Sequence, residues 1–196
     1  VDYQLPYRIY GGTQDNNTIR TLTGSIDDWS AILGGDGFYT IVDPENSDII
    51  YAEYQWGNLF KSTDGGASMN NISDVWNDDR TNWSSPVIMD RENPSSLYFG
   101  TYRVWKTQNS GNNWLPISED LTDGDDGSSY HTITTLALSM HDNEIVLAGT
   151  DDGNLHITQN GGGSWVNIGN NPTDLGALLF SGLYKLRYNN WKTAFI

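Results

Sequence analysis

Cysteine is absent from the 196 residues of this chain. Without a thiol the chain has no disulfide, no thiolate nucleophile and no cysteine metal ligand. Basic residues are scarce as well, with 10 Lys and Arg against 25 Asp and Glu and a formal net charge of −15. Because such a charge repels a phosphate backbone, we expect no nucleic-acid ligand.

Long apolar runs and basic amphipathic stretches are also missing, so no membrane association is expected. No secretory signal peptide opens the sequence, and Val1 is not an initiator methionine, which indicates a processed or truncated product. What the chain does contain is 37% apolar and 12% aromatic residues, including 8 Trp and 11 Tyr. This composition is sufficient for a single folded domain over residues 1–196.

One short signature occurs three times, at residues 62–69, 107–114 and 158–165. Each copy reads Ser/Thr-x-Asp/Asn-x-Gly-x-x-Trp or apolar, and the copies are spaced by 45 and 51 residues. Asp or Asn can fold back onto nearby backbone N–H groups, and Gly supplies a positive φ, so each copy is predicted to be a hairpin turn. The positions expected to be structural are Ser62, Asp64, Gly66, Thr107, Asn109, Gly111, Trp114, Thr158, Asn160, Gly162 and Trp165.

A second signature precedes the first two copies, at residues 43–51 and 90–98, with a weaker version at 140–147. Together these motifs resemble the Asp-box, or BNR, repeat family of β-propellers, which includes sialidases, sortilin-type receptors and xyloglucan-active glycoside hydrolases. The chain departs from the family at Met69, where an aromatic residue is usual, and at Asn109 and Asn160, where Asp is commoner. The resemblance covers about residues 1–172, and the segment Gly176–Ile196 no longer looks like the family.

The expected fold is therefore all-β, a β-propeller or half-propeller of four-stranded antiparallel blades. Blade-like units are predicted at about 31–75, 83–120 and 131–170, with residues 1–30 and 171–196 completing a further blade. Three arrangements fit this pattern. They are a self-closed four-bladed monomer, a half-propeller that closes as a homodimer, and a piece of a longer protein.

Two aspartates stand out as candidate catalytic groups, Asp15 in a Gln-Asp-Asn sequence and Asp36 among glycines. Glycoside hydrolysis needs two carboxyl groups about 5–10 Å apart. The resemblance to xyloglucan-active enzymes implies catalytic Asp residues in Gly-rich loops at the propeller centre. The other interpretation is that both aspartates stabilise turns. Glu53, on an expected strand, is a further carboxylate of interest.

Candidate ligand-binding residues are the aromatic side chains in or beside expected loops, Trp56, Trp83, Trp105 and Tyr102. A flat amphipathic ring can stack on a sugar or anchor a peptide, although aromatic residues also fill propeller cores. Arg8, in Tyr-Arg-Ile-Tyr, is one residue from the sialidase motif whose arginine binds a sugar carboxylate. Its other interpretation is a strand arginine paired with surface acid.

An acidic loop at Asp123, Asp125 and Asp126 could offer oxygen ligands to a weakly bound Ca²⁺, although it does not follow the EF-hand pattern. The alternative is a solvated acidic loop. The histidines show no metal-ligand spacing, so no other metal site and no cofactor are expected.

From the sequence we expect a non-catalytic binding or scaffolding module for a glycan or protein ligand. The alternatives are a glycoside hydrolase acting through Asp15 and Asp36, and a repeat fragment without its own activity. The resemblance favours a secreted or extracytoplasmic location.

Overall fold

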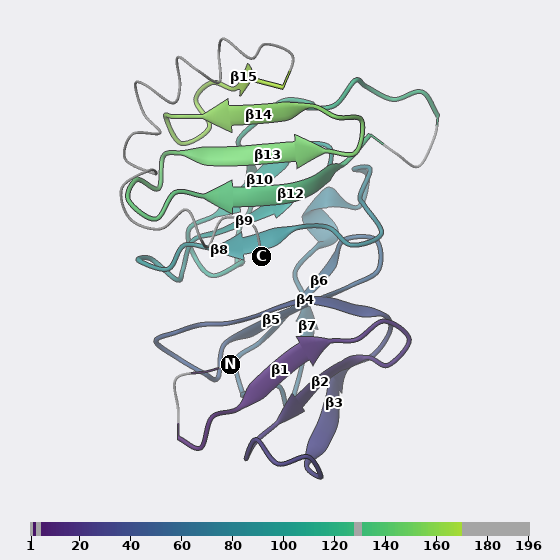
Figure 1. Ribbon diagram of the computed structural model, residues 1–196, viewed down its shortest axis with the longest axis vertical. Coiled ribbons are helices and arrows are strands. Elements are labelled where there is room, and N and C mark those ends of the chain that lie inside the picture. Colours follow the sequence, from purple (N-terminus) through teal and green to yellow (C-terminus); the bar gives the residue numbers. More distant parts are fainter. Residues whose placement is uncertain (1, 3–4, 128–130, 170–196) are drawn as a thin grey trace.

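The computed structural model describes residues 2, 5–127 and 131–169. These residues form four antiparallel sheets (Figure 1). The first sheet contains β1 (Ile9–Gly12), β2 (Thr18–Thr21) and β3 (Trp29–Leu33), and the second contains β4 (Gly37–Val42), β5 (Ile50–Tyr54), β6 (Asn58–Ser62) and β7 (Asn70–Asn71). The third contains β8 (Val87–Met89), β9 (Leu97–Gly100), β10 (Val104–Thr107) and β11 (Leu115–Pro116), and the fourth contains β12 (Ile133–Leu138), β13 (Val146–Thr150), β14 (Leu155–Thr158) and β15 (Val166–Asn167). A short 3-10 helix, η1 (Asp74–Trp76), follows β7.

Within each sheet the strands pair in the order of the sequence, so every sheet is an antiparallel meander. The boundary between the first two sheets lies after Leu33, because β3 pairs with β2 and the chain turns through 34–36 before β4 begins. The unit expected at 31–75 therefore starts later, and residues before it supply three strands. The expected contribution of residues 171–196 lies outside the described residues.

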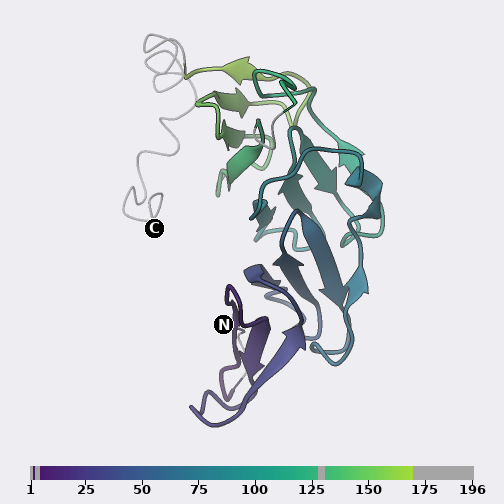
Figure 2. The ribbon, with the colours of Figure 1, turned by 90° about the vertical axis from the view of Figure 1, so that its right-hand side faces the viewer.

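Successive sheets stack face to face along an open arc, with the first and fourth sheets at its opposite ends (Figure 2). The described residues therefore form a partial ring and not a closed ring of four sheets. Closure by a second copy stays a prediction.

Aromatic side chains fill the space between the second and third sheets. Trp76 of η1 stacks on Phe99 with ring centroids 4.3 Å apart, and Trp114 meets Trp76 edge to face at 5.2 Å. Between the third and fourth sheets, Trp165 donates its indole N–H to the carbonyl oxygen of Ile117 at 2.7 Å. Burial of each such side chain contributes about 2 kcal/mol or more, which holds adjacent sheets together.

The three repeated motifs are turns between the third and fourth strands of their sheets. In the first, the Ser62 hydroxyl donates to Asp64 Oδ1 at 2.7 Å and accepts from the Gly66 N–H at 2.8 Å. Asp64 Oδ1 also accepts from the Ser68 N–H at 2.9 Å. The same contacts recur among Thr107, Asn109, Gly111 and Asn113 and among Thr158, Asn160, Gly162 and Ser164.

No helix within the described part of the chain is long and apolar enough to cross a membrane.

Candidate functional site

The two ends of the strands form two faces of the arc. Successive turns of an antiparallel meander lie at alternate strand ends, so the two faces carry different connections. One, here called the connector face, carries the turns 13–17, 55–57, 101–103 and 151–154 and the inter-sheet connections 34–36, 72–86 and 117–132. The other, the box face, carries the Asp-box turns and the turns between the first and second strands of the second, third and fourth sheets. Hydrogen bonds confirm the division: the Asp151 N–H donates to Thr132 O on the connector face, and the Gly65 N–H donates to Asp48 O on the box face.

A pair of partly exposed tryptophans occupies the connector face where the second and third sheets meet. The N–H of Trp56 donates to the carbonyl oxygen of Trp83 at 3.1 Å, and the two rings meet edge to face with centroids 4.9 Å apart. Phe38 also meets Trp83 edge to face, with ring centroids 6.0 Å apart. Half of the surface of Trp56 and about a third of that of Trp83 remain exposed, at 50% and 36%. Both residues therefore retain surface that a ligand can contact.

Trp56 has an unusual backbone conformation. It is the middle residue of the three-residue hairpin turn 55–57, and the φ angles of Trp56 and Gly57 are 62° and 69°. Positive φ favours Gly and Asn, and a bulky residue with positive φ is an outlier. The Trp56 ring is therefore held at the surface by a strained backbone.

Asp36 and Asp15 meet through the backbone of Asp15. The Asp15 N–H donates to Asp36 Oδ1 at 2.6 Å, and Gln55 Nε2 donates to Asp36 Oδ2 at 3.0 Å. Gln55 Oε1 in turn accepts from the Asp36 N–H at 3.0 Å. Both oxygens of Asp36 thus fix the turns around it, which is the arrangement of a turn-stabilising carboxylate. No motif in the sequence indicates that Gln55 joins this group.

Glu53 lies in the interior, fully buried on β5. Its Oε1 accepts from the Ser85 N–H at 2.8 Å, while Oε2 is buried without a hydrogen-bond partner. It stands opposite an irregularity in β4, where Phe38 and Tyr39 face the single residue Glu53. Burial raises the pKa of Glu53 to about 8, so the side chain is protonated at neutral pH. Burial and the nearby Glu53 also raise the pKa of Tyr39.

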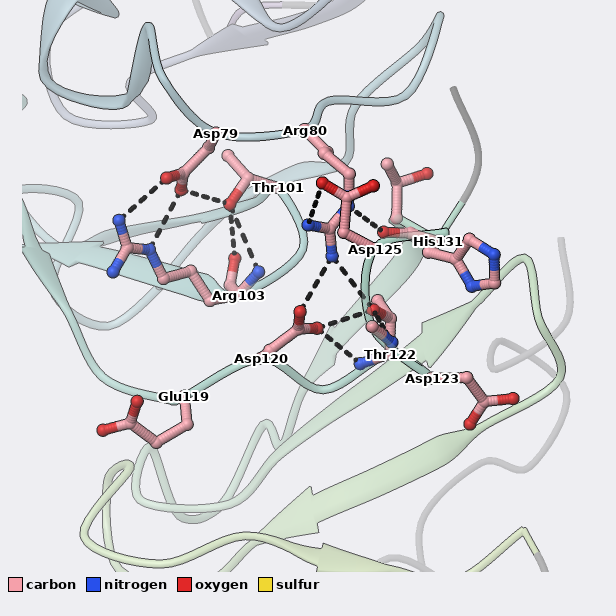
Figure 3. A network of polar contacts seen from close by, with 12 residues as sticks. Asp79, Arg80, Thr101, Arg103, Glu119, Asp120, Thr122, Asp123, Asp125 and His131 are labelled. Carbon is pink, nitrogen blue, oxygen red and sulfur yellow. Dashed lines mark hydrogen bonds and ion pairs between the residues drawn. The ribbon is translucent and has the colours of Figure 1, made fainter. Parts of the chain in front are cut away.

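Figure 3 shows a network of charged groups that includes Asp79, Arg80 and Arg103. The expected binding residues Tyr102 and Trp105 contact this network. Asp79 accepts two hydrogen bonds from Arg103, at 2.8 and 3.0 Å, and one from the indole N–H of Trp105 at 2.8 Å. Trp105 is only 5% exposed, so its ring is part of the packing between sheets. Tyr102 lies between two guanidinium groups, with Arg80 4.5 Å and Arg103 5.1 Å from its ring centroid.

The acidic loop makes contacts with several separate partners. Asp123 accepts from Asn154 Nδ2 at 2.9 Å, Asp125 lies 3.8 Å from Arg80, and Asp126 lies 3.3 Å from His131 Nε2. Across residues 2, 5–127 and 131–169, no group of three or more potential ligand residues is arranged to hold a metal ion. Calcium binding here stays a prediction.

His131 is a further residue that the sequence did not single out. Its Nδ1 lies 3.1 Å from Asp152 and its Nε2 3.3 Å from Asp126. Hydrogen bonds to Asp152 and Asp126 raise the pKa of His131, which joins the connection 117–132 to the turn 151–154.

Arg8 lies on the box face, remote from the tryptophan pair. Its Nε is 2.6 Å from Asp2 Oδ2, and its Nη2 donates to Ser47 Oγ at 2.5 Å. It therefore bridges the first and second sheets.

No family model and no curated protein matches the chain. Solved structures do match it. The GH74 enzyme of Niastella koreensis aligns with a TM-score of 0.60 and 16% identity over 82% of this chain and 27% of that one. An ancestral GH74 enzyme aligns with a TM-score of 0.59 and 19% identity over 82% of this chain and 24% of that one.

The GH74 xyloglucanase from Xanthomonas campestris aligns with a TM-score of 0.57 and 15% identity over 83% of this chain and 29% of that one. The chain spans only about a quarter of the length of these structures. At such low identity the likeness concerns the fold alone. The chain has the fold of part of a β-propeller.

Proposed function

We propose that the chain is a non-catalytic binding module whose connector face holds a polysaccharide against Trp56 and Trp83. The observation that carries this proposal is the exposed ring of Trp56 on a backbone with φ of 62°. That conformation costs about 1–2 kcal/mol for a residue with a side chain. Asn or Gly would form the same turn without strain, so a tryptophan here is better explained by contact with a ligand.

The chemistry around the pair suits a sugar chain. Aromatic rings offer flat apolar faces to pyranose rings, and polar groups beside them can bind hydroxyls. Gln55 adjoins Trp56 in the sequence, and the Thr81 hydroxyl donates to the Trp56 carbonyl oxygen at 3.1 Å. One structural neighbour is a xyloglucanase, which makes xyloglucan a reasonable first ligand to test.

Binding is favoured over hydrolysis by the state of the nearby carboxyl groups. Asp36 uses both oxygens to accept hydrogen bonds from Asp15 and Gln55. Glu53 has the raised pKa of a proton donor, but it is fully buried and cannot reach a substrate. Hydrolysis by Asp15 and Asp36 remains the alternative proposal, and an extracytoplasmic location remains a prediction that fits a polysaccharide ligand.

The test is calorimetric titration of the chain with soluble xyloglucan and its oligosaccharides. We expect the unsubstituted chain to bind and Trp83→Ala to weaken binding at least tenfold. Trp29→Ala is the matched control, because Trp29 is also exposed, at 42%, but lies on β3 of the first sheet. Equal losses in both variants, or no binding at all, would contradict the proposal. Release of reducing ends that disappears in Asp36→Asn would support the hydrolase instead.

A further inference from the structure

The first strand of each of the other three sheets, β4, β8 or β12, is here called the innermost strand. The first sheet has no counterpart of it. The other sheets have four strands each, whereas the first has β1, β2 and β3. The turn from β1 to β2 lies on the connector face, where its Asn17 N–H donates to Gly35 O. In the other sheets the connector face holds the turn between second and third strands. β1 therefore corresponds to β5, β9 and β13, which are second strands.

A repeated hydrogen bond supports this correspondence. In the second, third and fourth sheets, the residue after the innermost strand donates its N–H to the carbonyl oxygen six residues later. These bonds join Asp43 to Ile49 at 3.0 Å, Asp90 to Ser96 at 2.9 Å and Ser139 to Ile145 at 3.0 Å. The first sheet has the same hydrogen bond, which the Asp2 N–H donates to the Arg8 carbonyl oxygen at 3.0 Å. Asp2 is buried, as Asp43, Asp90 and Ser139 are.

The backbone of β1 is set up to receive a strand. The Thr13 N–H donates to the Asn17 carbonyl oxygen, which fixes which residues of β1 form hydrogen-bonded pairs with β2. Because such pairs alternate along an antiparallel ladder, the backbone groups of Ile9 and Gly11 bond to β2. The backbone N–H and C=O groups of Tyr10 and Gly12 point to the opposite edge of β1. In the third sheet the equivalent residues are Tyr98 and Gly100, and Gly100 donates to Pro86 O beside the innermost strand at 2.9 Å. No described strand pairs with β1 at its Tyr10 edge.

The residues of β1 are also less buried than those of β5 and β9, the strands to which β1 corresponds. All four residues of β9 are buried, and so are the first four of β5, whereas β1 has one exposed and three half-buried residues. The close approach of Gly12 to Phe38 does not fill the missing place. Gly100 lies close both to the Ile133 side chain of the next sheet and to Pro86 beside β8, so contact with the next sheet does not prevent pairing with an innermost strand.

We infer that the free edge of β1 is a docking site for an extended polypeptide strand. The strand runs antiparallel to β1, ends beside Asp2 and is rich in apolar and β-branched residues, as β4, β8 and β12 are. We assign this strand to a polypeptide other than residues 1–196, because no described strand lies at this edge and the last described strand, β15, belongs to the fourth sheet at the opposite end of the arc from β1 (Figure 2).

The probe is a four-residue graft, Thr-Thr-Leu-Ala, placed directly before Val1. It copies residues 134–137, which precede Leu138 in β12. Its alanine falls opposite Tyr10, and the control graft has proline there, which cannot donate to the Tyr10 carbonyl. Residue-resolved hydrogen exchange of the Tyr10 and Gly12 amides is the readout, with Tyr98 as the reference.

We expect the graft to slow exchange of both amides at least tenfold and to raise the melting temperature, and the proline graft to do neither. Equal exchange with the two grafts would overturn the inference. The inference would also be overturned if the Tyr10 amide of the ungrafted chain were as strongly protected from exchange as the Tyr98 amide at every chain concentration. The chain's own residues would then fill the edge. Protection that grows with chain concentration would assign the site to a second copy and would also overturn it.

Discussion

The backbone N–H of Trp56 donates to the carbonyl oxygen of Trp83, and their indole rings meet edge to face. This contact joins a hairpin turn of the second sheet to the connection that leads into the third. The orientation of both rings is therefore set by the fold before any ligand arrives, which reduces the entropy lost on binding.

Trp56→Asn should separate the ligand-binding role of Trp56 from stability. Asparagine tolerates a φ of 62°, so we expect the free energy of unfolding to stay unchanged or to rise by about 1 kcal/mol while xyloglucan binding is lost. Urea denaturation and calorimetric titration measure the two effects. Trp56→Ala is the matched control, because it removes the ring and keeps the strain. A large loss of stability in Trp56→Asn would show that the ring serves packing.

Asp64→Asn should alter the acid stability of the chain without altering ligand binding. Hydrogen bonds from the Ser68 hydroxyl, the Ser68 N–H and the Ser62 hydroxyl lower the pKa of Asp64 to about 2. A depressed pKa contributes stability that is present above the unfolded value near 4 and is lost as the pH falls to about 2.

The third box already contains the amide version, in which Asn160 Nδ2 donates to Ser164 Oγ at 3.0 Å. Asp64→Asn should therefore remain folded at pH 7 and lose less stability than the unsubstituted chain between pH 4 and pH 2. Thermal melts at several pH values provide the measurement. Loss of ligand binding in folded Asp64→Asn would refute a purely structural role for the boxes.

Glu53→Gln should remove a loss of stability that develops between about pH 4.5 and pH 8. The folded pKa of about 8 exceeds the ordinary value of 4.5, so folding favours the protonated acid. Its contribution is most favourable below pH 4.5 and declines as the pH rises to 8, by at most about 1.4 kcal/mol per pH unit. Urea midpoints from pH 5 to pH 9 should fall less in Glu53→Gln. Parallel pH profiles for the two proteins would mean that Glu53 ionises normally.

Asp126→Asn should lower the pKa of His131. Hydrogen bonds to Asp152 and Asp126 stabilise the imidazolium, so this pKa lies above 6.5. A raised histidine pKa gives stability that is present below 6.5 and lost as the pH rises through the folded value. NMR titration of the His131 ring protons measures the shift directly, with His156 as the reference, since burial lowers its pKa. An unchanged His131 pKa would show that Asp126 exerts no influence on the ring in solution.

The repeated turns could be predicted from the sequence because their chemistry is local. Ser62, Asp64 and Gly66 bond to one another within five residues, so the motif alone specifies the turn. Contacts between residues far apart in the sequence could not be predicted in this way. Trp105 was expected to bind ligand because it lies beside a loop, but its indole N–H reaches Asp79, 26 residues earlier, and its ring is buried.

Other features depend on the sheet arrangement. The environment of Glu53 depends on the irregular pairing of β4 and on Ser85 in the connection 72–86, neither of which the sequence around Glu53 reveals. The turn at Asp2 lacks the proline of the Asp43 copy, so the sequence does not mark it, and only its hydrogen bond to Arg8 shows that it matches the others.

The most direct test of the proposed binding site is to follow the indole N–H resonances by NMR while xyloglucan oligosaccharide is added. The account predicts that the signals of Trp56 and Trp83 shift together and saturate at one ligand concentration, while the signals of exposed Trp29 and buried Trp76 stay in place. Saturable shifts confined to other tryptophans, or no shift at any ligand concentration, would contradict it.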